Sequence, residues 1–356
     1  MRYFFLLSFF LLLIFSKVKT LGLDGEFNLL NIGSSNNINK SFKIRNNKIL
    51  ISTKELGLLE HSKDLNIWYG VKRGKRFIEN IDAEKAYFRF RKLNPRPVQT
   101  YVPKNYDPSK KYPLIINIHG FTGDWKHQNG YFPLKEYAEK YGFIFCVPDG
   151  EFDSNNRRRW NAIDACCGTR HDLPDDSTYL RSIIDHARKV FSVDESRIYS
   201  MGFSNGGMMS YRMAIDHSDI LAGIVVVGGI SFKDTKYSPK FPIHVLHVHG
   251  TLEENFHGTK LGDLAFYHAP TPSVQKNILN WSKFNNCEPN YVKEEALDLV
   301  ARLPGNETKI ISYTNKENGC DVELWQVKNG VHVEEYSKSM KEMLVDWMLE
   351  HPKIKK

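Results

Sequence analysis

The sequence predicts an α/β protein with a mostly parallel sheet that is covered by helices on both faces. From about residue 80 onward, short apolar runs typical of buried strands alternate with amphipathic helical stretches. Parallel strands that are buried on both faces have this continuous apolar character, and crossover helices connect them. With 41% hydrophobic and 25% charged residues, the composition is that of a folded chain and excludes a disordered, collagen-like or multispanning protein.

The expected elements follow one another in a regular order. The strands are expected at residues 87–91, 97–102, 113–119, 143–147, 197–201, 221–227, 243–248 and 323–327. Apolar residues at helical spacing predict helices over 178–191, 274–284 and 340–347, and a further helix directly after Ser204. Because no internal repeat or linker interrupts this pattern, we expect one three-layer domain over residues 81–356.

The N-terminal region differs from the rest of the chain. Arg2 is followed by an apolar run over residues 3–16 and then by Lys17 and Lys19. This run is shorter than the roughly 20 residues that span a bilayer, so residues 1–20 are expected to be a cleaved signal peptide. The protein is then secreted and extracellular, with no stable membrane anchor. Residues 21–80 are rich in Asn, Lys and Ser and predict a partly disordered extension.

Secretion makes disulfide bonds and glycans the default expectation. The chain has five cysteines, so at least one has no intramolecular partner. Cys146 lies in an apolar run and is expected to be a buried strand residue, whereas the pairing of Cys166 and Cys167 stays open. Three glycosylation sequons begin at Asn39, Asn280 and Asn306.

The strongest chemical signal is the segment Gly202-Phe-Ser204-Asn-Gly206. It is a Gly-x-Ser-x-Gly motif that follows a predicted buried strand and begins a predicted helix. A sharp strand-to-helix turn exposes the serine hydroxyl, small neighbours prevent collisions, and the helix N-terminus favours negative charge. We therefore expect Ser204 to be a catalytic nucleophile.

A serine nucleophile needs a base and an acid, which in this fold follow it in the order Ser, acid, His. The strand expected at 243–248 is followed by Glu253 and Glu254, and the last strand is followed by His332. Position and order predict His332 as the base and favour Glu253 over Glu254 as the acid. The sequence pattern alone does not decide which of the two glutamates is the acid.

An acyl-transfer site also needs donors for the developing oxyanion. The amide of Asn205, next to the nucleophile, is the expected first donor, and Phe121 or Thr122, in the loop after the strand at 113–119, is the expected second donor. His119 is expected to brace this loop rather than to take part in chemistry.

Other residues have weaker interpretations. Trp125 and Trp160 lie on loops and are candidates to bind substrate by stacking, or else they pack in the core. Asp175 is expected to cap a helix. His247 and His249 share a strand face without a third ligand at suitable spacing, so no metal is expected.

Together these motifs resemble a known group, the secreted polyhydroxybutyrate depolymerases and feruloyl esterases of carbohydrate esterase family one. The resemblance covers about residues 95–350 and rests on residues 112–120, 160–168, 175–176, 202–209 and 249–251. It implies the α/β-hydrolase fold, with Ser204 as nucleophile, Glu253 at the place of the family's usual aspartate and His332 at its catalytic histidine. It also implies a disulfide between Cys287 and Cys320.

This chain departs from that family in two places. The acid is a glutamate, and the family's Gly-His-Thr-Trp-Pro-Gly-like end is replaced by Gly330-Val-His-Val-Glu334.

The sequence therefore favours a secreted serine esterase that uses no cofactor. The expected substrates are feruloyl or acetyl esters of plant-wall polysaccharide such as xylan, or polyhydroxyalkanoate polyester. The alternatives are a secreted serine peptidase of the same fold and a non-catalytic binding protein. Nucleic acid is not an expected partner, because the net charge of +8 is mild and its Lys and Arg residues accompany no recognition motif.

Overall fold

The computed structural model divides the chain into two compact units, Met1–Tyr101 and Val102–Lys356. It describes residues 25–30, 40–45, 48–51, 58–63, 66–71, 96, 98–153, 156–163, 166–167, 174–255 and 271–354. The expected signal peptide and the expected strand at 87–91 lie outside the described residues. Among the residues described, each helix is too short or too polar to cross a lipid bilayer.

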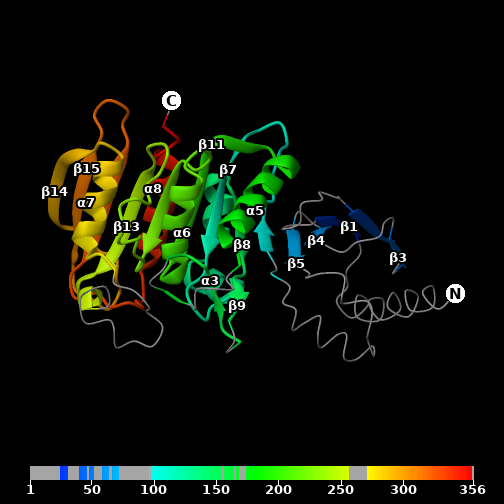
Figure 1. Cartoon of the computed structure of the whole chain (residues 1–356), viewed down its shortest axis with the longest axis horizontal. Helices are drawn as coiled ribbons and strands as arrows, with labels where there is room; N and C mark the ends of the chain where they lie inside the picture. The colour runs from blue at the N-terminus through cyan, green and yellow to red at the C-terminus, as the bar shows by residue number, and fades with distance from the viewer. Residues whose placement is uncertain are drawn as a thin grey trace. The chain divides into compact units, whose positions relative to one another are not determined.

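The first unit contains an antiparallel sheet in the order β3-β2-β1-β4-β5, whose strands are blue in Figure 1. Its strands are β1 (Gly25–Leu30), β2 (Lys40–Arg45), β3 (Lys48–Ile51), β4 (Leu58–Lys63) and β5 (Asn66–Val71), and β6 (Val98–Tyr101) ends the unit. The extension expected at residues 21–80 thus contains regular strands. Their pattern is easily missed in sequence, because short alternations such as Phe42-Lys-Ile44 stand among Asn-rich segments.

The second unit is built on a parallel sheet, as the sequence predicts. Neighbouring strands run β16-β13-β12-β11-β7-β8, and all these pairs are parallel. They are β7 (Tyr112–Ile118), β8 (Ile144–Pro148), β11 (Val193–Phe203), β12 (Gly223–Val227), β13 (His244–Gly250) and β16 (Asp321–Val327). Every residue of β7, β8, β12 and β13 is buried, which accounts for the continuous apolar runs in the sequence.

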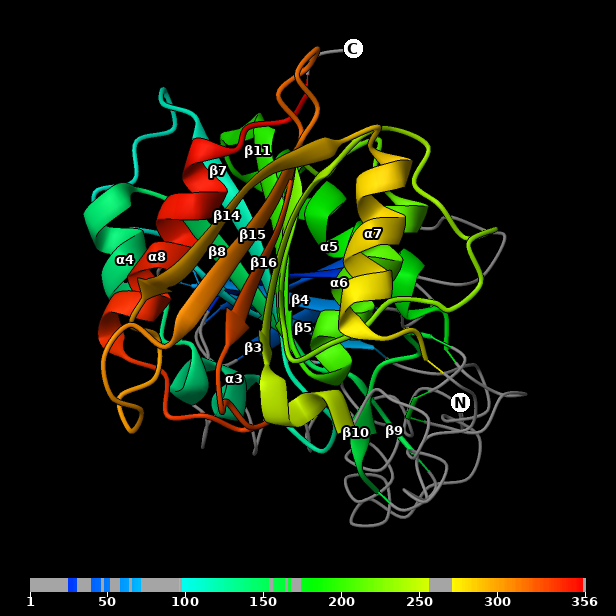
Figure 2. The same cartoon turned by 90° about the vertical axis from the view of Figure 1, so that its left-hand side faces the viewer.

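Helices cover both faces of this sheet (Figure 2). The helices α4 and α8 lie on one face, and α5, α6 and α7 lie on the other. Their bounds are α4 (Lys135–Tyr141), α5 (Asp176–Val190), α6 (Asn205–Asp216), α7 (Val274–Phe284) and α8 (Lys338–Glu350). Asp175 caps α5 as expected, because its side chain accepts a hydrogen bond from the Thr178 amide at 3.0 Å.

Several elements are absent from the sequence prediction. The strands β14 (Glu288–Leu297) and β15 (Thr308–Thr314) extend the sheet antiparallel beyond β16. The strand β14 has mainly exposed residues, so it lacks the apolar run by which the central strands were predicted. The helix α3 (Trp125–Tyr131) and the two-residue strands β9 (Glu151–Phe152) and β10 (Arg158–Arg159) are too short for a periodic signal.

Candidate active site

Ser204 lies on a tight turn between β11 and α6. Its φ of 54° and ψ of −118° are rare for a residue with a side chain. The turn is held from both sides, because the Ser204 amide donates to the Val227 carbonyl at 2.8 Å and the Met208 amide donates to the Ser204 carbonyl at 2.9 Å. At Gly206 a Cβ would lie 2.2 Å from the Ile118 carbonyl oxygen, so this position requires glycine. The local geometry is the predicted nucleophile turn.

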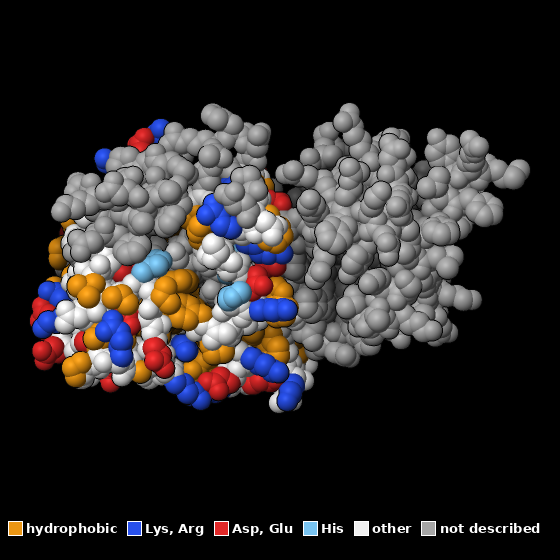
Figure 3. Space-filling model, turned by 90° about the horizontal axis from the view of Figure 1, so that it is seen from below, with side chains coloured by type: hydrophobic (Ala, Val, Ile, Leu, Met, Phe, Trp, Pro, Cys, Tyr) orange, Lys and Arg blue, Asp and Glu red, His pale blue; other side chains and the backbone are white. Residues whose placement is uncertain are grey.

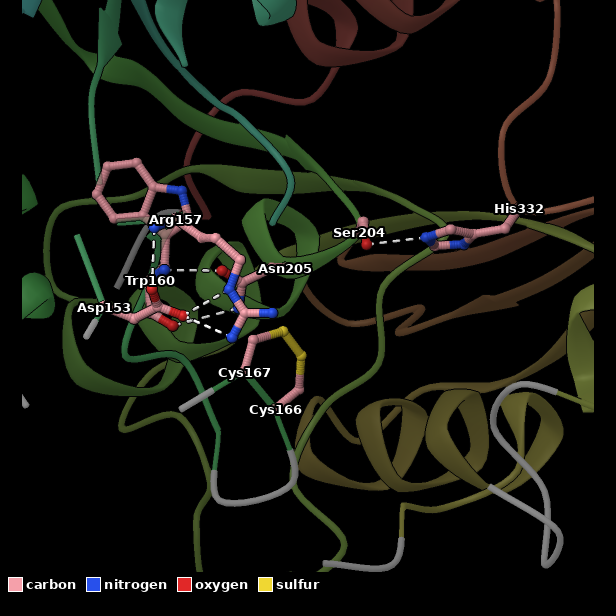
Figure 4. Close-up of a disulfide and its surroundings, with 8 residues drawn as sticks. All are labelled: Asp153, Arg157, Trp160, Cys166, Cys167, Ser204, Asn205 and His332. Atoms are coloured by element: carbon pink, nitrogen blue, oxygen red, sulfur yellow. Dashed lines mark hydrogen bonds and ion pairs between the residues drawn. A yellow bond between two sulfur atoms is a disulfide. The ribbon is translucent and has the colours of Figure 1, made fainter. Parts of the chain in front are cut away.

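Ser204, His332 and Glu253 form one hydrogen-bonded chain. His332 Nε2 is 2.8 Å from Ser204 Oγ, and His332 Nδ1 is 2.6 Å from Glu253 Oε2 (Figure 4 shows the serine and the histidine). The serine follows β11, the acid is in the short helix η2 (Thr251–Asn255) after β13, and the histidine follows β16. Because these strands are parallel, their carboxyl ends bring the three side chains to one edge of the sheet.

The acid side chain is fully buried and doubly held. Glu253 has no exposed surface, and its second oxygen, Oε1, accepts a hydrogen bond from the Gly250 amide at 2.9 Å. A buried carboxylate requires such partners, because an unpaired charge costs several kcal/mol or more in a protein interior. The geometry therefore favours Glu253 as the acid. The side chain of Glu254 is outside the described residues.

The loops that carry the acid and the base are joined directly. The Leu252 amide donates to the Gly330 carbonyl at 3.0 Å, and the Asn329 amide donates to Thr251 Oγ1 at 2.9 Å. At Gly250 a Cβ would lie 2.3 Å from the Gly330 carbonyl oxygen. Close backbone packing thus sets the distance between Glu253 and His332.

The expected oxyanion donors belong to two segments that lie close to Ser204, since a Cβ on Gly120 would lie 3.3 Å from Ser204 Cβ. Asn205 is the first residue of α6, and amides in a first helical turn have no partner within the helix. In the opposite loop, the Thr122 amide donates to the Arg158 carbonyl at 2.8 Å. Because that amide is occupied, Phe121 is the better candidate for the second donor. Its ring lies 4.8 Å from the Arg157 guanidinium, a neighbour that sequence reasoning missed.

His119 and Trp160 are hydrogen-bonded to the loops on which the candidate site lies. His119 Nε2 accepts a hydrogen bond from the Gly150 amide at 2.8 Å and its Nδ1 is 2.7 Å from the Gly120 carbonyl, which agrees with a bracing role. The Trp160 indole donates to the His119 carbonyl at 2.9 Å, and the Trp160 backbone exchanges two hydrogen bonds with the Asn205 side chain (Figure 4). With no exposed surface, Trp160 cannot stack on a substrate, and that interpretation is corrected. Trp125 is partly exposed and stays a candidate.

The cysteines pair differently from what the resemblance implied. Cys166 and Cys167 form a disulfide near Asn205 (Figure 4). Cys146, Cys287 and Cys320 are not in a disulfide bond, so the expected bond between Cys287 and Cys320 is wrong for this structure. The Cys287 thiol instead donates to the Cys320 carbonyl at 3.2 Å, and a hydrogen bond with the Cys320 thiol lowers the pKa of Cys287. The thiols are neighbours but are not bonded.

The histidine pair that raised the question of a metal is explained by hydrogen bonds. His247 contacts Tyr211 Oη at 2.6 Å and His249 at 3.0 Å. Among the described residues, a different group brings possible ligand atoms within 4.8 Å of one another, namely His244, Asp321 and His351. These side chains already bond one another and nearby backbone, and they lie at the strand ends opposite to Ser204. We assign no metal to this group.

The three predicted sequons differ in accessibility. Asn280 is only 7% exposed within α7, so a glycan cannot be accommodated there in the folded protein. Asn306 is exposed, and Asn39 is outside the described residues.

Comparisons with known proteins find esterases among the relatives of this chain. Residues 106–261 match the phospholipase/carboxylesterase family. The bifunctional acetylxylan esterase/xylanase of Neocallimastix patriciarum is 26% identical over 159 residues, which are 45% of this chain and 22% of that protein. Feruloyl esterase B of Piromyces equi is 26% identical over 253 residues, which are 67% of this chain and 43% of that protein.

A solved structure shows the same fold. The acetyl xylan esterase from Aspergillus awamori has a TM-score of 0.50 and 16% identity, and the match covers 71% of this chain and 93% of that chain. The α/β-hydrolase fold and the resemblance to feruloyl and acetylxylan esterases are thereby confirmed. The chain spans less than half the length of the two curated relatives named above.

Proposed function

We propose that this protein is a serine esterase. Its α/β-hydrolase fold and the match of residues 106–261 to the phospholipase/carboxylesterase family support the proposal. The observation that carries the proposal is the chain Glu253–His332–Ser204, with contacts of 2.6 and 2.8 Å. A base within hydrogen-bond reach of the hydroxyl and oriented by a buried carboxylate is the arrangement that activates a serine.

The geometry supports the following steps of ester hydrolysis. His332 Nε2 accepts the Ser204 hydroxyl proton while Oγ attacks the ester carbonyl, and Glu253 stabilises the imidazolium through Nδ1–H. The amides of Asn205 and Phe121 are proposed to stabilise the oxyanion, aided by the N-terminus of α6. His332 then gives its proton to the leaving alkoxide, which leaves an acyl-serine. Water, deprotonated by His332, releases the acid and restores the serine.

The proposed substrates are esters of plant-wall polysaccharide. The named relatives are a feruloyl esterase and an acetylxylan esterase, which supports feruloyl or acetyl groups on xylan, and polyhydroxyalkanoate polyester is the further candidate. Exposed hydrophobic side chains gather beside histidine on the face seen in Figure 3. Leu252, Val331 and Val333 are 50%, 37% and 67% exposed, and they flank Glu253 and His332 in sequence. Exposed apolar side chains on the segments that carry Glu253 and His332 favour an ester with an apolar part, such as an aromatic acyl group.

We also propose that the protein is secreted, with residues 1–20 as its signal peptide. This rests on the basic start and the short apolar run of the sequence. Of the alternatives, a non-catalytic binding protein is disfavoured, because a drifted site would not need to keep three aligned side chains. Among the described residues, no specific contact favours a peptidase.

The test is hydrolysis of an ester panel by the wild type and by Ser204→Ala. The panel contains methyl ferulate, acetylated xylan, p-nitrophenyl acetate and butyrate, and polyhydroxybutyrate. We expect Ser204→Ala to lower kcat/KM at least about 10³-fold with the fold intact by circular dichroism. Ser182→Ala is the matched control, since its hydroxyl only bonds the Tyr179 carbonyl within α5. Turnover of every ester by Ser204→Ala at the wild-type rate would exclude the assignment.

A further inference from the structure

We propose that Glu334 is a positioning residue that, together with Arg302 and Tyr131, holds His332 in its reactive geometry. The inference rests on the proposed function, because it assigns a role in the same site. None of the three residues bonds the reacting atoms. They act on the loop between β16 and α8 that carries His332.

The Glu334 carboxylate closes the loop around His332. Its side chain is 1% exposed, and Oε1 accepts a hydrogen bond from the Val331 amide at 2.6 Å. Val331 precedes His332 and Glu334 follows it, so this contact fixes the backbone on both sides of the histidine. A buried carboxylate with a backbone amide partner restricts such a turn much more than a solvated loop residue does.

Arg302 pairs with the buried Glu334 carboxylate and also bonds the start of the loop that carries His332. Its Nε donates to Glu334 Oε2 at 2.9 Å, and one terminal nitrogen also contacts Oε1. The same nitrogen donates to the Asn329 carbonyl at 3.1 Å. Arg302 comes from the segment between β14 and β15, so the bidentate pair connects two separate segments of the chain.

Tyr131 holds the loop from the other side. Its hydroxyl donates to the Glu334 carbonyl at 3.0 Å and accepts from the Glu334 amide at 3.1 Å. The Tyr131 ring packs edge-on against Phe203, with the centroids 4.9 Å apart, and the Phe203 ring is 5.1 Å from the His332 imidazole. Because Phe203 directly precedes Ser204, this ring contact fixes the position of His332 relative to Ser204.

These contacts matter because His332 must satisfy two short hydrogen bonds at once. A misplacement of about 1 Å in a catalytic group can cost about 10²-fold in rate. The contacts of Glu334, Arg302 and Tyr131, which we call the brace, thus hold His332 in position before substrate binds. Their loss should lower kcat rather than weaken substrate binding.

The test uses Arg302→Gln and Glu334→Gln in the full chain. The Arg302 side chain is 43% exposed, so its replacement leaves no core cavity and keeps the test valid if Glu334→Gln does not fold. We expect kcat to fall at least about tenfold with KM within about twofold. Arg302→Lys, which keeps the charge, should recover part of the loss, and Tyr131→Phe should also lower kcat.

Arg188→Gln is the matched control. Arg188 is 33% exposed and pairs with Asp185 and Glu195, far from the site in the fold. Its replacement removes an arginine–carboxylate ion pair outside the site and should leave kcat unchanged. The proposal is overturned if Arg302→Gln keeps kcat within about twofold of the wild type, or if Arg188→Gln lowers kcat equally.

A second readout does not need activity. The Nδ1–H proton that bonds Glu253 should give a downfield proton resonance, identified by its loss in His332→Ala. We expect Arg302→Gln to broaden or shift this resonance and Arg188→Gln to leave it in place. An unchanged resonance in Arg302→Gln would contradict the brace. Absence of serine-dependent hydrolysis in the wild type would instead contradict the proposed function, and the two failures are therefore distinguishable.

Discussion

At the scale of single residues, Glu253 stands where the family that this chain resembles usually has an aspartate. Its longer side chain is accommodated because η2 begins directly after β13 and turns Glu253 back, so that Oε1 bonds the Gly250 amide at 2.9 Å. The remaining oxygen then reaches His332. The extra methylene is thus absorbed by a local turn, and the contact with the base keeps its short length of 2.6 Å.

Replacement of this carboxylate should be costly although the residue never touches substrate. We expect Glu253→Gln to lower kcat by about 10²- to 10⁴-fold, because the neutral amide cannot stabilise the imidazolium and can favour the wrong tautomer. Steady-state hydrolysis of p-nitrophenyl acetate measures the effect. Glu254→Gln, the adjacent substitution of the same kind, is the control and should stay within about twofold of wild-type kcat. A large loss in Glu254→Gln alone would make Glu254 the acid.

At the scale of elements, the C-terminal end of α8 docks onto the amino ends of β13 and β16 through a polar cluster. His351 Nε2 is 3.2 Å from Asp321 Oδ2, and the Asp321 amide donates to His244 Nδ1 at 3.1 Å. Burial, together with the neighbouring His351, lowers the pKa of His244 to about 4. Burial lowers the pKa of His351, but hydrogen bonds with Asp321 and the Trp347 carbonyl have a larger effect together, so the pKa of His351 is raised.

This cluster predicts a pH dependence of stability. An unfolded histidine titrates near pH 6.5, so between about pH 6.5 and 4 the unfolded state binds the His244 proton and the folded state does not. The free energy of unfolding should therefore fall with falling pH in this window, by at most about 3 kcal/mol from His244. His351 contributes in the opposite direction, since its raised pKa stabilises the fold at low pH.

The contribution of His244 is isolated by comparison with His244→Gln. Urea unfolding at pH 8, 6.5 and 5 should show a smaller loss of stability between pH 6.5 and 5 in the variant than in the wild type. Because His351 is present in both proteins, its opposing effect largely cancels. Equal losses in the two proteins would show that His244 is not buried in its neutral form.

At the scale of the whole molecule, the five cysteines test the tertiary structure directly. One disulfide joins Cys166 and Cys167, and the other three cysteines keep their thiols. Alkylation of the denatured, unreduced protein should therefore label three cysteines, Cys146, Cys287 and Cys320. Mass spectrometry of the tryptic peptides identifies them. Labelling of Cys146 alone would show that Cys287 and Cys320 are bonded, as the resemblance implied.

The fold of the second unit was largely predictable, because its signals are local. Buried parallel strands such as residues 113–119 are apolar throughout, and helices such as 274–284 repeat apolar residues with the period of the helix. The strand β14 was not predicted, because an exposed edge strand lacks the local apolar run on which the prediction depends.

What the sequence by itself determined is the parallel α/β architecture, Ser204 as the candidate nucleophile and the chain order of the candidate acid and base. Each depends on residues within a short window or on the direction of parallel strands. Only the tertiary structure decided that Glu253 contacts His332, that Trp160 is buried and that Thr122 has an occupied amide. It alone revealed the contact of Tyr131 with Glu334, 203 residues apart. Such contacts depend on how loops that are distant in sequence meet in the fold. No periodicity or motif in the chain encodes how close those loops come.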